Sequence, residues 1–205
     1  AAADVSSKVS RRRGAVANTL FVFATPKFAI EALVTAYKLG WHPKIFLGHA
    51  AASSSTFLGA ANRAAGSPDA TNGVISVSFL VDPANARFDG TPGTRLYRQI
   101  MDKYPPGADQ KDATYLEGMA LAYTMVDMLK QAGRDLTRER LMQVVENITE
   151  TDHPFVLPGV TVRTTPHDHF PVTQVAVGEV HNGICDPSGT LDATRRDWRN
   201  LDGPT

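Results

Sequence analysis

Three short apolar runs, separated by segments with helical periodicity, constrain what this chain can fold into more than any other feature of its sequence. They are TLFVFA, KIFL and GVISVSFL, at residues 19–24, 44–47 and 73–80. A short run that is apolar at nearly every position is typical of a strand covered on both faces, as in a parallel sheet between two helical layers. We therefore expect these runs to be strands of one buried sheet.

Two helices are expected between these strands. The first follows Thr25, a good N-cap residue, begins at Pro26 and ends before Gly40. The second is expected at residues 56–65. The order strand, helix, strand, helix, strand predicts an α/β fold, namely a Rossmann-like lobe with a parallel sheet and right-handed crossovers.

The pattern changes twice in the rest of the chain. Three further helices are expected at residues 93–104, 113–132 and 137–148. From Pro154 onward the sequence favours β-strands that flank the turn TTPHDH, and the end of the chain is rich in charged residues. We therefore predict a large α/β lobe, a set of hinge-crossing strands and a peripheral tail, at residues 1–153, 154–185 and 186–205.

The composition excludes several classes of function. Among 205 residues, 21 are Lys or Arg and 21 are Asp or Glu, so the formal net charge is zero and a nucleic-acid partner is not expected. No run reaches the roughly 18 apolar residues of a membrane span, and no signal peptide is visible. The phosphate-binding motifs GxGxxG and GxxxxGK[ST] and the nucleophile elbow GxSxG are all missing, so neither a cofactor nor a catalytic residue is expected. The single cysteine, Cys185, is interpreted as a spectator thiol.

A ligand of an open parallel sheet binds where the strands reach their carboxyl ends. Three strand ends and one helix start therefore supply the candidate ligand-binding residues. They are Ala24, Thr25, Gly48, His49, Ala50, Phe79, Tyr115 and Glu117. The helix after Thr25 can direct free N–H groups at a carboxylate, whereas Glu117 can pair with an ammonium group and Tyr115 can form an apolar wall.

Each of the larger candidates also has a purely structural interpretation. Thr25 caps a helix whatever else it does, and His49 can be an ordinary loop histidine. Tyr115 can pack in the core, and Glu117 can be a surface carboxylate near a helix N-terminus.

His167, Asp168 and His169 form the most enzyme-like motif, because histidine and aspartate are common metal ligands. In an extended segment, however, adjacent side chains point to opposite sides, so Asp168 would face away from both histidines. The flanking prolines favour a turn, and no metal site is expected.

Several longer stretches resemble the type 1 periplasmic binding proteins of ABC transporters, in the branched-chain amino acid or leucine-binding class. They are FATPKFAIEALVTAYKLGW, GVISVSFLVDPAN, YPPGADQKDATYLEGMALAYTMVDMLKQAG and TPHDHFPVTQ. The resemblance extends to about Gly183 and implies two α/β lobes joined by three crossover segments, of which this chain is similar to the C-terminal portion. The sequence departs from the family pattern at Glu117-Gly118, where relatives commonly have Tyr-Gly.

The resemblance implies a solute-binding protein outside the cytoplasm that captures an amino acid or a similar small carboxylate. It implies two protein partners, an ABC permease and a missing N-terminal lobe. Surfaces that such a lobe would cover favour self-association when it is absent. Two alternatives stay open, a ligand-sensing domain of a regulator or receptor and, from another class, a metal-dependent hydrolase.

Overall fold

The computed structural model describes residues 5–105, 107–187 and 192–193. Its helices are α1 (Val5–Gly14), α2 (Pro26–Lys38), α3 (Gly59–Ala65), α4 (Pro92–Lys103), α5 (Ala113–Ala132) and α6 (Arg138–Val145). Three short helical turns are η1 (His49–Ala51), η2 (Ser54–Leu58) and η3 (Ala86–Phe88). The strands are β1 (Thr19–Val22), β2 (Lys44–Leu47), β3 (Ile75–Ser78), β4 (Thr149–Glu150), β5 (Val162–Arg163), β6 (Gln174–His181), β7 (Ile184–Pro187) and β8 (Asp192–Ala193).

The main sheet has the strand order β1-β2-β3-β6-β7, with β8 paired to β6. The pairs β1–β2 and β2–β3 are parallel, as the alternation of strands and helices predicted. Strand β6 joins β3 in the antiparallel sense, because the chain returns to the sheet from the opposite direction. The α/β fold with a Rossmann-like lobe is thereby confirmed.

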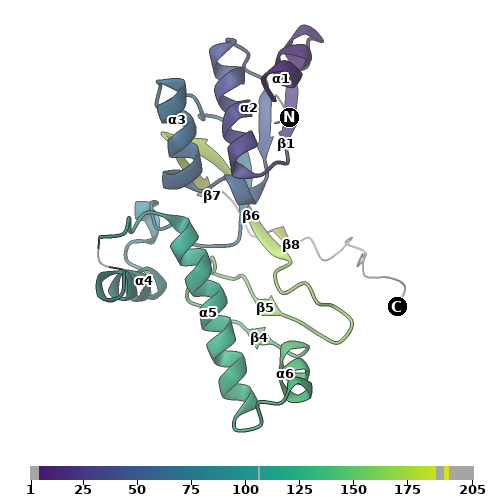
Figure 1. Ribbon diagram of the computed structural model, residues 1–205, viewed down its shortest axis with the longest axis vertical. Coiled ribbons are helices and arrows are strands. Elements are labelled where there is room, and N and C mark those ends of the chain that lie inside the picture. The colour runs from purple at the N-terminus through teal and green to yellow at the C-terminus, as the bar shows by residue number, and fades with distance from the viewer. Residues whose placement is uncertain (1–4, 106, 188–191, 194–205) are drawn as a thin grey trace.

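The buried apolar residues form two clusters rather than one. The upper cluster in Figure 1 holds α1 to α3 against the sheet and includes Leu33, Leu58 and Val180. The lower cluster holds α4 to α6 and the small sheet β4–β5, and includes Tyr97 and Phe155. We call these parts the upper and lower units.

Two segments carry the chain between the units. The first leaves β3, since Ser78 belongs to that strand while Leu80 is already in the lower cluster. The second is β6, whose Ala176 packs in the lower cluster and whose Val180 packs in the upper one. The predicted hinge-crossing strand is therefore present near the carboxyl end of the chain. The two clusters divide the chain after β3 and within β6, and not at residues 153 and 185. The periodicity of the sequence does not change where the chain leaves β3, so sequence alone did not indicate this division. The predicted boundaries at 153 and 185 stay a prediction.

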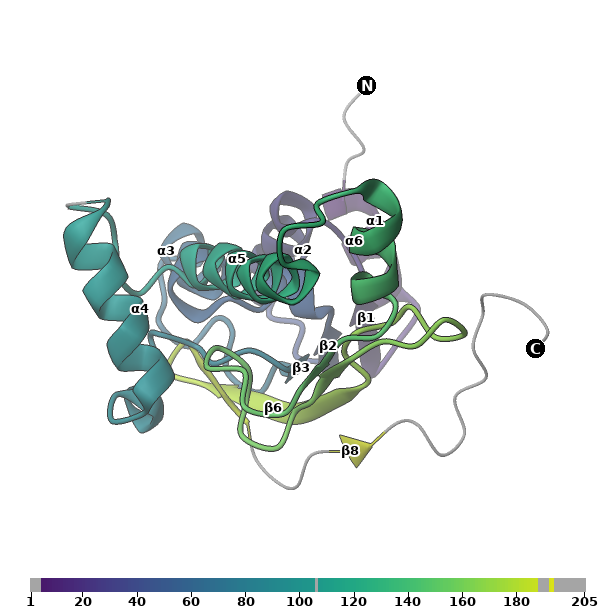
Figure 2. The ribbon, with the colours of Figure 1, turned by 90° about the horizontal axis from the view of Figure 1, so that it is seen from below.

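One sequence-based expectation about β1 is wrong. Helices α1, α2 and α3 all lie on the same side of the sheet, and no described helix covers its other side (Figure 2). Leu20 and Val22 face the helices, whereas Phe21 is 62% and Phe23 81% exposed. The run 19–24 is apolar on both faces, but within the described residues only one face is covered.

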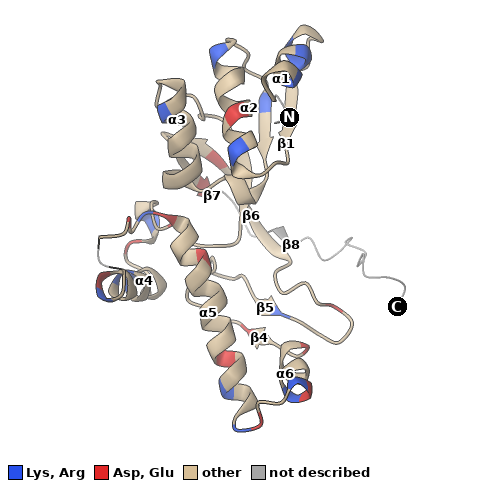
Figure 3. Cartoon of the chain, in the orientation of Figure 1, with Lys and Arg blue, Asp and Glu red and all other residues tan. Residues whose placement is uncertain are grey.

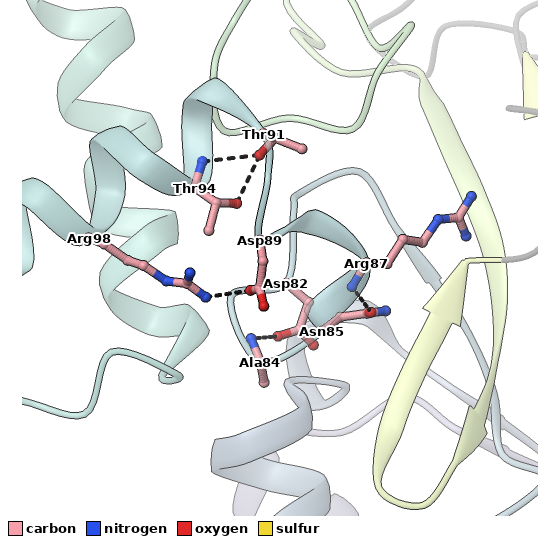
Figure 4. Close-up of polar contacts among 8 residues, drawn as sticks. All are labelled: Asp82, Ala84, Asn85, Arg87, Asp89, Thr91, Thr94 and Arg98. Atoms are coloured by element: carbon pink, nitrogen blue, oxygen red, sulfur yellow. Dashed lines mark hydrogen bonds and ion pairs between the residues drawn. The ribbon is translucent and has the colours of Figure 1, made fainter.

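Side chains that bond to nearby backbone shape the connection from β3 to α4 (Figure 4). Asp82 accepts the N–H of Ala84 at 2.8 Å, and Asn85 accepts that of Arg87 at 3.0 Å. Thr91 then caps α4 by accepting the N–H of Thr94 at 3.2 Å. Such side-chain bonds replace the regular backbone bonds that a loop lacks. The crossing from the upper to the lower unit is thus an ordered turn.

The motif around His167 forms a turn, as predicted. Thr165 and Asp168 exchange backbone hydrogen bonds at 2.9 and 3.1 Å. Among the residues that the structure describes, no three His, Cys, Asp or Glu side chains are grouped so as to hold a metal ion. In the same residues, no helix combines the length and the apolar character needed to cross a membrane.

Candidate functional site

A cavity of about 70 Å³ lies where the carboxyl ends of β2 and β3 meet the start of α5 and the strand β7. It therefore lies at the junction of the two units. It is lined by His49, Ala50, Ala52, Ser53, Phe57, Val77, Ser78, Leu80, Val81, Asp82, Ala113, Thr114, Glu117, Cys185 and Pro187. This is the edge at which the strand-end rule placed the ligand, and three predicted residues, His49, Ala50 and Glu117, line the cavity.

His49 is held by contacts with Val77 of β3 and with Phe79, which directly follows β3. It opens the turn η1 directly after Gly48, and its Nδ1 lies 2.9 Å from the carbonyl oxygen of Val77. Its ring packs against Phe79 with a centroid distance of 4.8 Å. Phe79 is thus a wall for His49, although it does not itself line the cavity.

Glu117 reaches the cavity because the start of α5 is attached to the upper unit. Asp112 caps α5 by accepting the N–H of Thr114 at 2.9 Å, and its carboxylate also accepts the hydroxyl of Thr56 at 2.7 Å. The hydroxyl of Ser55 donates to the carbonyl of Lys111. These bonds bring the first turns of α5 beside η2, with the exposed carboxylate of Glu117 at the cavity wall.

Hydrogen bonds of the buried Ser54 join two residues of the cavity wall, Asp82 and Cys185. The hydroxyl of Ser54, which is 2% exposed, donates to the carboxylate of Asp82 and accepts the N–H of Cys185 at 3.1 Å. Burial raises the pKa of Asp82, although the bonds from Ser54 and Ala84 oppose this shift. Burial, together with the charges of Asp82 and Asp186, raises the pKa of Cys185 to about 11. The thiol is therefore protonated at neutral pH and is a poor nucleophile.

The remaining predicted residues do not line the cavity. Ala24 and Thr25 are exposed at the end of β1, and Thr25 occupies the N-cap position of α2 without a side-chain capping bond. Gly48 donates its N–H to the carbonyl of Val22 at 3.0 Å. Tyr115 is 42% exposed, so the core-packing interpretation of this residue is wrong.

Sequence reasoning did not select most of the lining residues, among them Ser53, Phe57, Asp82 and Cys185. Asp82 is the first charged residue after β3, so the strand-end rule could have identified it. The hydroxyls of Ser54 and Ser55 bond to residues far along the chain, which their local sequence does not indicate. Nothing in the local pattern indicates that Cys185 returns to this site through β7.

The cavity is equipped to bind hydrogen-bond donors. Its lining, as far as the described residues form it, contains the carboxylates of Asp82 and Glu117 but neither Lys nor Arg. Within the described residues, the hydroxyl oxygen of Ser53 is buried without a hydrogen-bond partner. The acidic positions at the start of α5 and on β7 lie on either side of the junction in Figure 3. A positively charged group with N–H donors suits this wall.

Comparison with known proteins identifies a family. Residues 1–184 match the sequence profile of the family described as periplasmic binding protein. A search of curated protein sequences gives no significant match.

Several solved structures share the fold. One is a branched chain amino acid ABC transporter protein from Thermus thermophilus with bound valine, which has a TM-score of 0.76 at 19% identity and is matched over 94% of this chain and 50% of its own. Another is a substrate binding protein of an ABC transporter from Aeropyrum pernix, with a TM-score of 0.73 at 15% identity over 95% and 49% of the two chains. A leucine binding protein from Thermotoga maritima has a TM-score of 0.64 at 15% identity over 92% and 49%. This chain thus spans about half the length of these proteins.

Proposed function

This chain belongs to the periplasmic binding protein family, and on that premise we propose that it captures an amino acid or a similar small carboxylate for an ABC importer. The family supports a solute-binding role outside the cytoplasm rather than an enzymatic one. An ABC permease is then the protein that receives the solute. The valine in the structure from Thermus thermophilus supports an amino acid as ligand.

The observation that carries the proposal is the acceptor-rich cavity at the strand ends. An amino acid has an ammonium group, and this wall offers the carboxylate of Glu117 without a competing Lys or Arg. Hydrogen bonds between charged groups are roughly twice as strong as neutral ones. We assign Glu117 as the partner of the ligand's ammonium group.

We propose that the residues around this cavity form one wall of a larger ligand site. Its volume of about 70 Å³ is small compared with the roughly 300–1,000 Å³ of pockets that enclose a small molecule. Solved relatives have about twice the matched length. A second α/β lobe that closes over the junction would supply the missing wall and hold the ligand's carboxylate.

The test is an NMR titration of the chain with valine and with its two truncated analogues. Isobutylamine keeps the ammonium group, and 3-methylbutanoate keeps the carboxylate. Valine and isobutylamine should shift the amide signals of Ala50 and Glu117, whereas 3-methylbutanoate should not. Replacing Glu117 by Gln should weaken valine binding about tenfold, the loss of one charge-assisted hydrogen bond.

The matched control is Glu139→Gln, because Glu139 is an exposed carboxylate on α6 that does not line the cavity. It should leave valine binding unchanged. Equal weakening in both variants, or stronger binding of 3-methylbutanoate than of isobutylamine, would contradict the assignment of Glu117. If no amino acid shifts any signal near the cavity even at ligand concentrations well above millimolar, the proposed function is wrong.

A further inference from the structure

The orientation of His49 fixes which of its nitrogens carries a hydrogen. A backbone carbonyl can only accept a hydrogen bond, and Nδ1 lies 2.9 Å from the carbonyl oxygen of Val77. Nδ1 must therefore be the donor. In a neutral imidazole the other nitrogen, Nε2, is then an acceptor.

The environment of the ring leaves this acceptor available. Among the described residues, no protein group forms a hydrogen bond with Nε2, while Phe79 fixes the plane of the ring at a centroid distance of 4.8 Å. His49 itself lines the cavity. Nε2 is thus the polar atom that this side chain can offer to a ligand.

The other titratable groups of the cavity wall include two carboxyl groups, which accept hydrogen bonds when they are ionised. They belong to Asp82, in the connection after β3, and to Glu117 in α5, whereas the protonated thiol of Cys185 in β7 is a weak donor. Strand β3 contributes no titratable side chain beside His49, since it places Val77, Ser78 and then Phe79 there. Neutral His49 therefore extends a wall of acceptors, and protonated His49 would place a positive donor within it.

We propose that His49 is a specificity-determining residue, whose Nε2 accepts a hydrogen bond from the ammonium group of the ligand when the imidazole is neutral and repels that group when the imidazole is protonated. The inference rests on the proposed function, because it assumes that the cavity takes an amino acid. It adds a direction of pH dependence: binding of the ammonium group weakens wherever a fall in pH protonates the imidazole. Histidine is the side chain that ordinarily changes charge between about pH 5 and 8.

Nitrogen NMR of the imidazole rings tests the tautomer without any ligand. Long-range correlations between ring protons and ring nitrogens distinguish a protonated nitrogen from an unprotonated one. The His49 signal, identified by its loss in His49→Asn, should show Nδ1 protonated and Nε2 unprotonated at about pH 8, where histidine is ordinarily neutral. The opposite tautomer overturns the proposal.

Two variants of His49 test its role in binding. Asn places its amide N–H where Nδ1 lies, so it keeps the bond to Val77 and removes the acceptor in the cavity. Gln reaches the position of Nε2 with an amide oxygen, which is an acceptor that does not titrate. Isobutylamine and valine, measured by NMR titration at about pH 8 and about pH 5.5, are the probes.

The wild-type chain should bind isobutylamine more weakly at the lower pH. His49→Asn should lose about three- to tenfold in affinity at the higher pH, and His49→Gln should keep most of the affinity without the pH dependence. If the wild type and His49→Asn have the same affinity and pH dependence, this inference is overturned while the proposed function stands. If the wild-type chain binds neither probe at either pH, even at probe concentrations well above millimolar, the proposed function is overturned, and this inference with it.

Discussion

The pKa values of two aspartates at the junction of the units are shifted in opposite directions. For Asp82, burial is the largest influence and raises the pKa in spite of the bonds from Ser54 and Ala84. For Asp112, burial also acts to raise the pKa, but the hydroxyl of Thr56 and the N–H of Thr114 outweigh it, so the pKa is lowered. Relative to the unfolded chain, folding therefore makes Asp82 harder to ionise and Asp112 easier to ionise.

The two aspartates predict opposite effects on the dependence of stability on pH. A raised pKa in the folded state means a contribution to stability that is present below the unfolded value, about 4 for aspartate, and is lost as the pH rises. Asp82→Asn should therefore increase the melting temperature at neutral pH, and the gain should vanish in acid. The hydroxyl of Ser54 can accept the new amide hydrogen while it still accepts the N–H of Cys185.

Asp112→Asn should change the melting temperature at neutral pH in the opposite direction. Its stabilising contribution is present above the unfolded pKa of about 4 and is lost as the pH falls, so this variant should lower the melting temperature at neutral pH but not in acid. Melting curves followed by circular dichroism between acid and neutral pH measure both variants. A lower melting temperature for Asp82→Asn at neutral pH would show that its hydrogen bonds outweigh its burial.

How far the candidate site could be predicted from sequence depends on how local the signal is. His49 and Glu117 follow directly from a strand end and a helix start, so the topology rule was enough to find them. Asp82 follows the end of β3 and was open to the same rule, whereas Cys185 lines the cavity because the chain crosses to the lower unit and returns through β6 and β7. Long-range returns of this kind leave no periodic signal in the sequence.

Among the elements, the helices were predicted most closely, because their ends have chemical markers. Asp112 and Thr137 cap α5 and α6 through bonds to Thr114 and Arg140, and Gly133, with a φ of 69°, ends α5. Strands lack such markers, and β3 is shorter than the apolar run 73–80 that predicted it. Apolar character on both faces of β1 did not establish that both faces are covered.

Two helical glycines differ sharply in the space around them and give a matched pair of substitutions. A Cβ at Gly93 in α4 would lie 1.7 Å from the carbonyl oxygen of Pro154, whereas a Cβ at Gly118 in α5 would meet nothing within 4 Å. Gly93→Ala should therefore reduce the free energy of unfolding by about 1–3 kcal/mol or more, since backbone must move. Gly118→Ala should increase it by about 0.5–1 kcal/mol, because alanine has the higher helix propensity.

Chemical denaturation of both glycine variants measures these differences. The close approach of α4 to residue 154 packs the lower unit, so Gly93→Ala should also weaken that unit first. Equal stability of the two variants would show that α4 does not approach Pro154 as closely as described.

At the scale of the whole molecule, apolar surface remains exposed on both units. The upper unit exposes Phe21 and Phe23 on the uncovered face of its sheet, and Phe21 stacks on Phe46 at a centroid distance of 4.7 Å. The lower unit exposes the outer side of α5, where Leu121 is 71% exposed and Met125 also reaches solvent. Exposed apolar patches that extend over neighbouring elements are characteristic of interaction surfaces. These surfaces are where we expect the proposed second lobe to pack.

Ligand affinity measures whether this chain holds a whole site or one wall of it. If each lobe of a two-lobe protein supplies about half of the contact free energy, a micromolar site of about −8.2 kcal/mol becomes a millimolar one of about −4.1 kcal/mol when one lobe is absent. Titration of the monomeric chain with valine should therefore give a dissociation constant of about 1 mM or weaker.

Extending the chain with the proposed second lobe should then restore micromolar affinity and bury the apolar faces of β1 and α5. Lower binding of a hydrophobic dye by the extended protein would report that burial independently of the ligand. Micromolar binding of valine by the chain alone, shown to be monomeric by sedimentation, would mean that His49, Glu117 and their neighbours form a complete pocket. In that case the two-lobe proposal would be wrong, and the cavity at the junction would have to open on binding to enclose an amino acid.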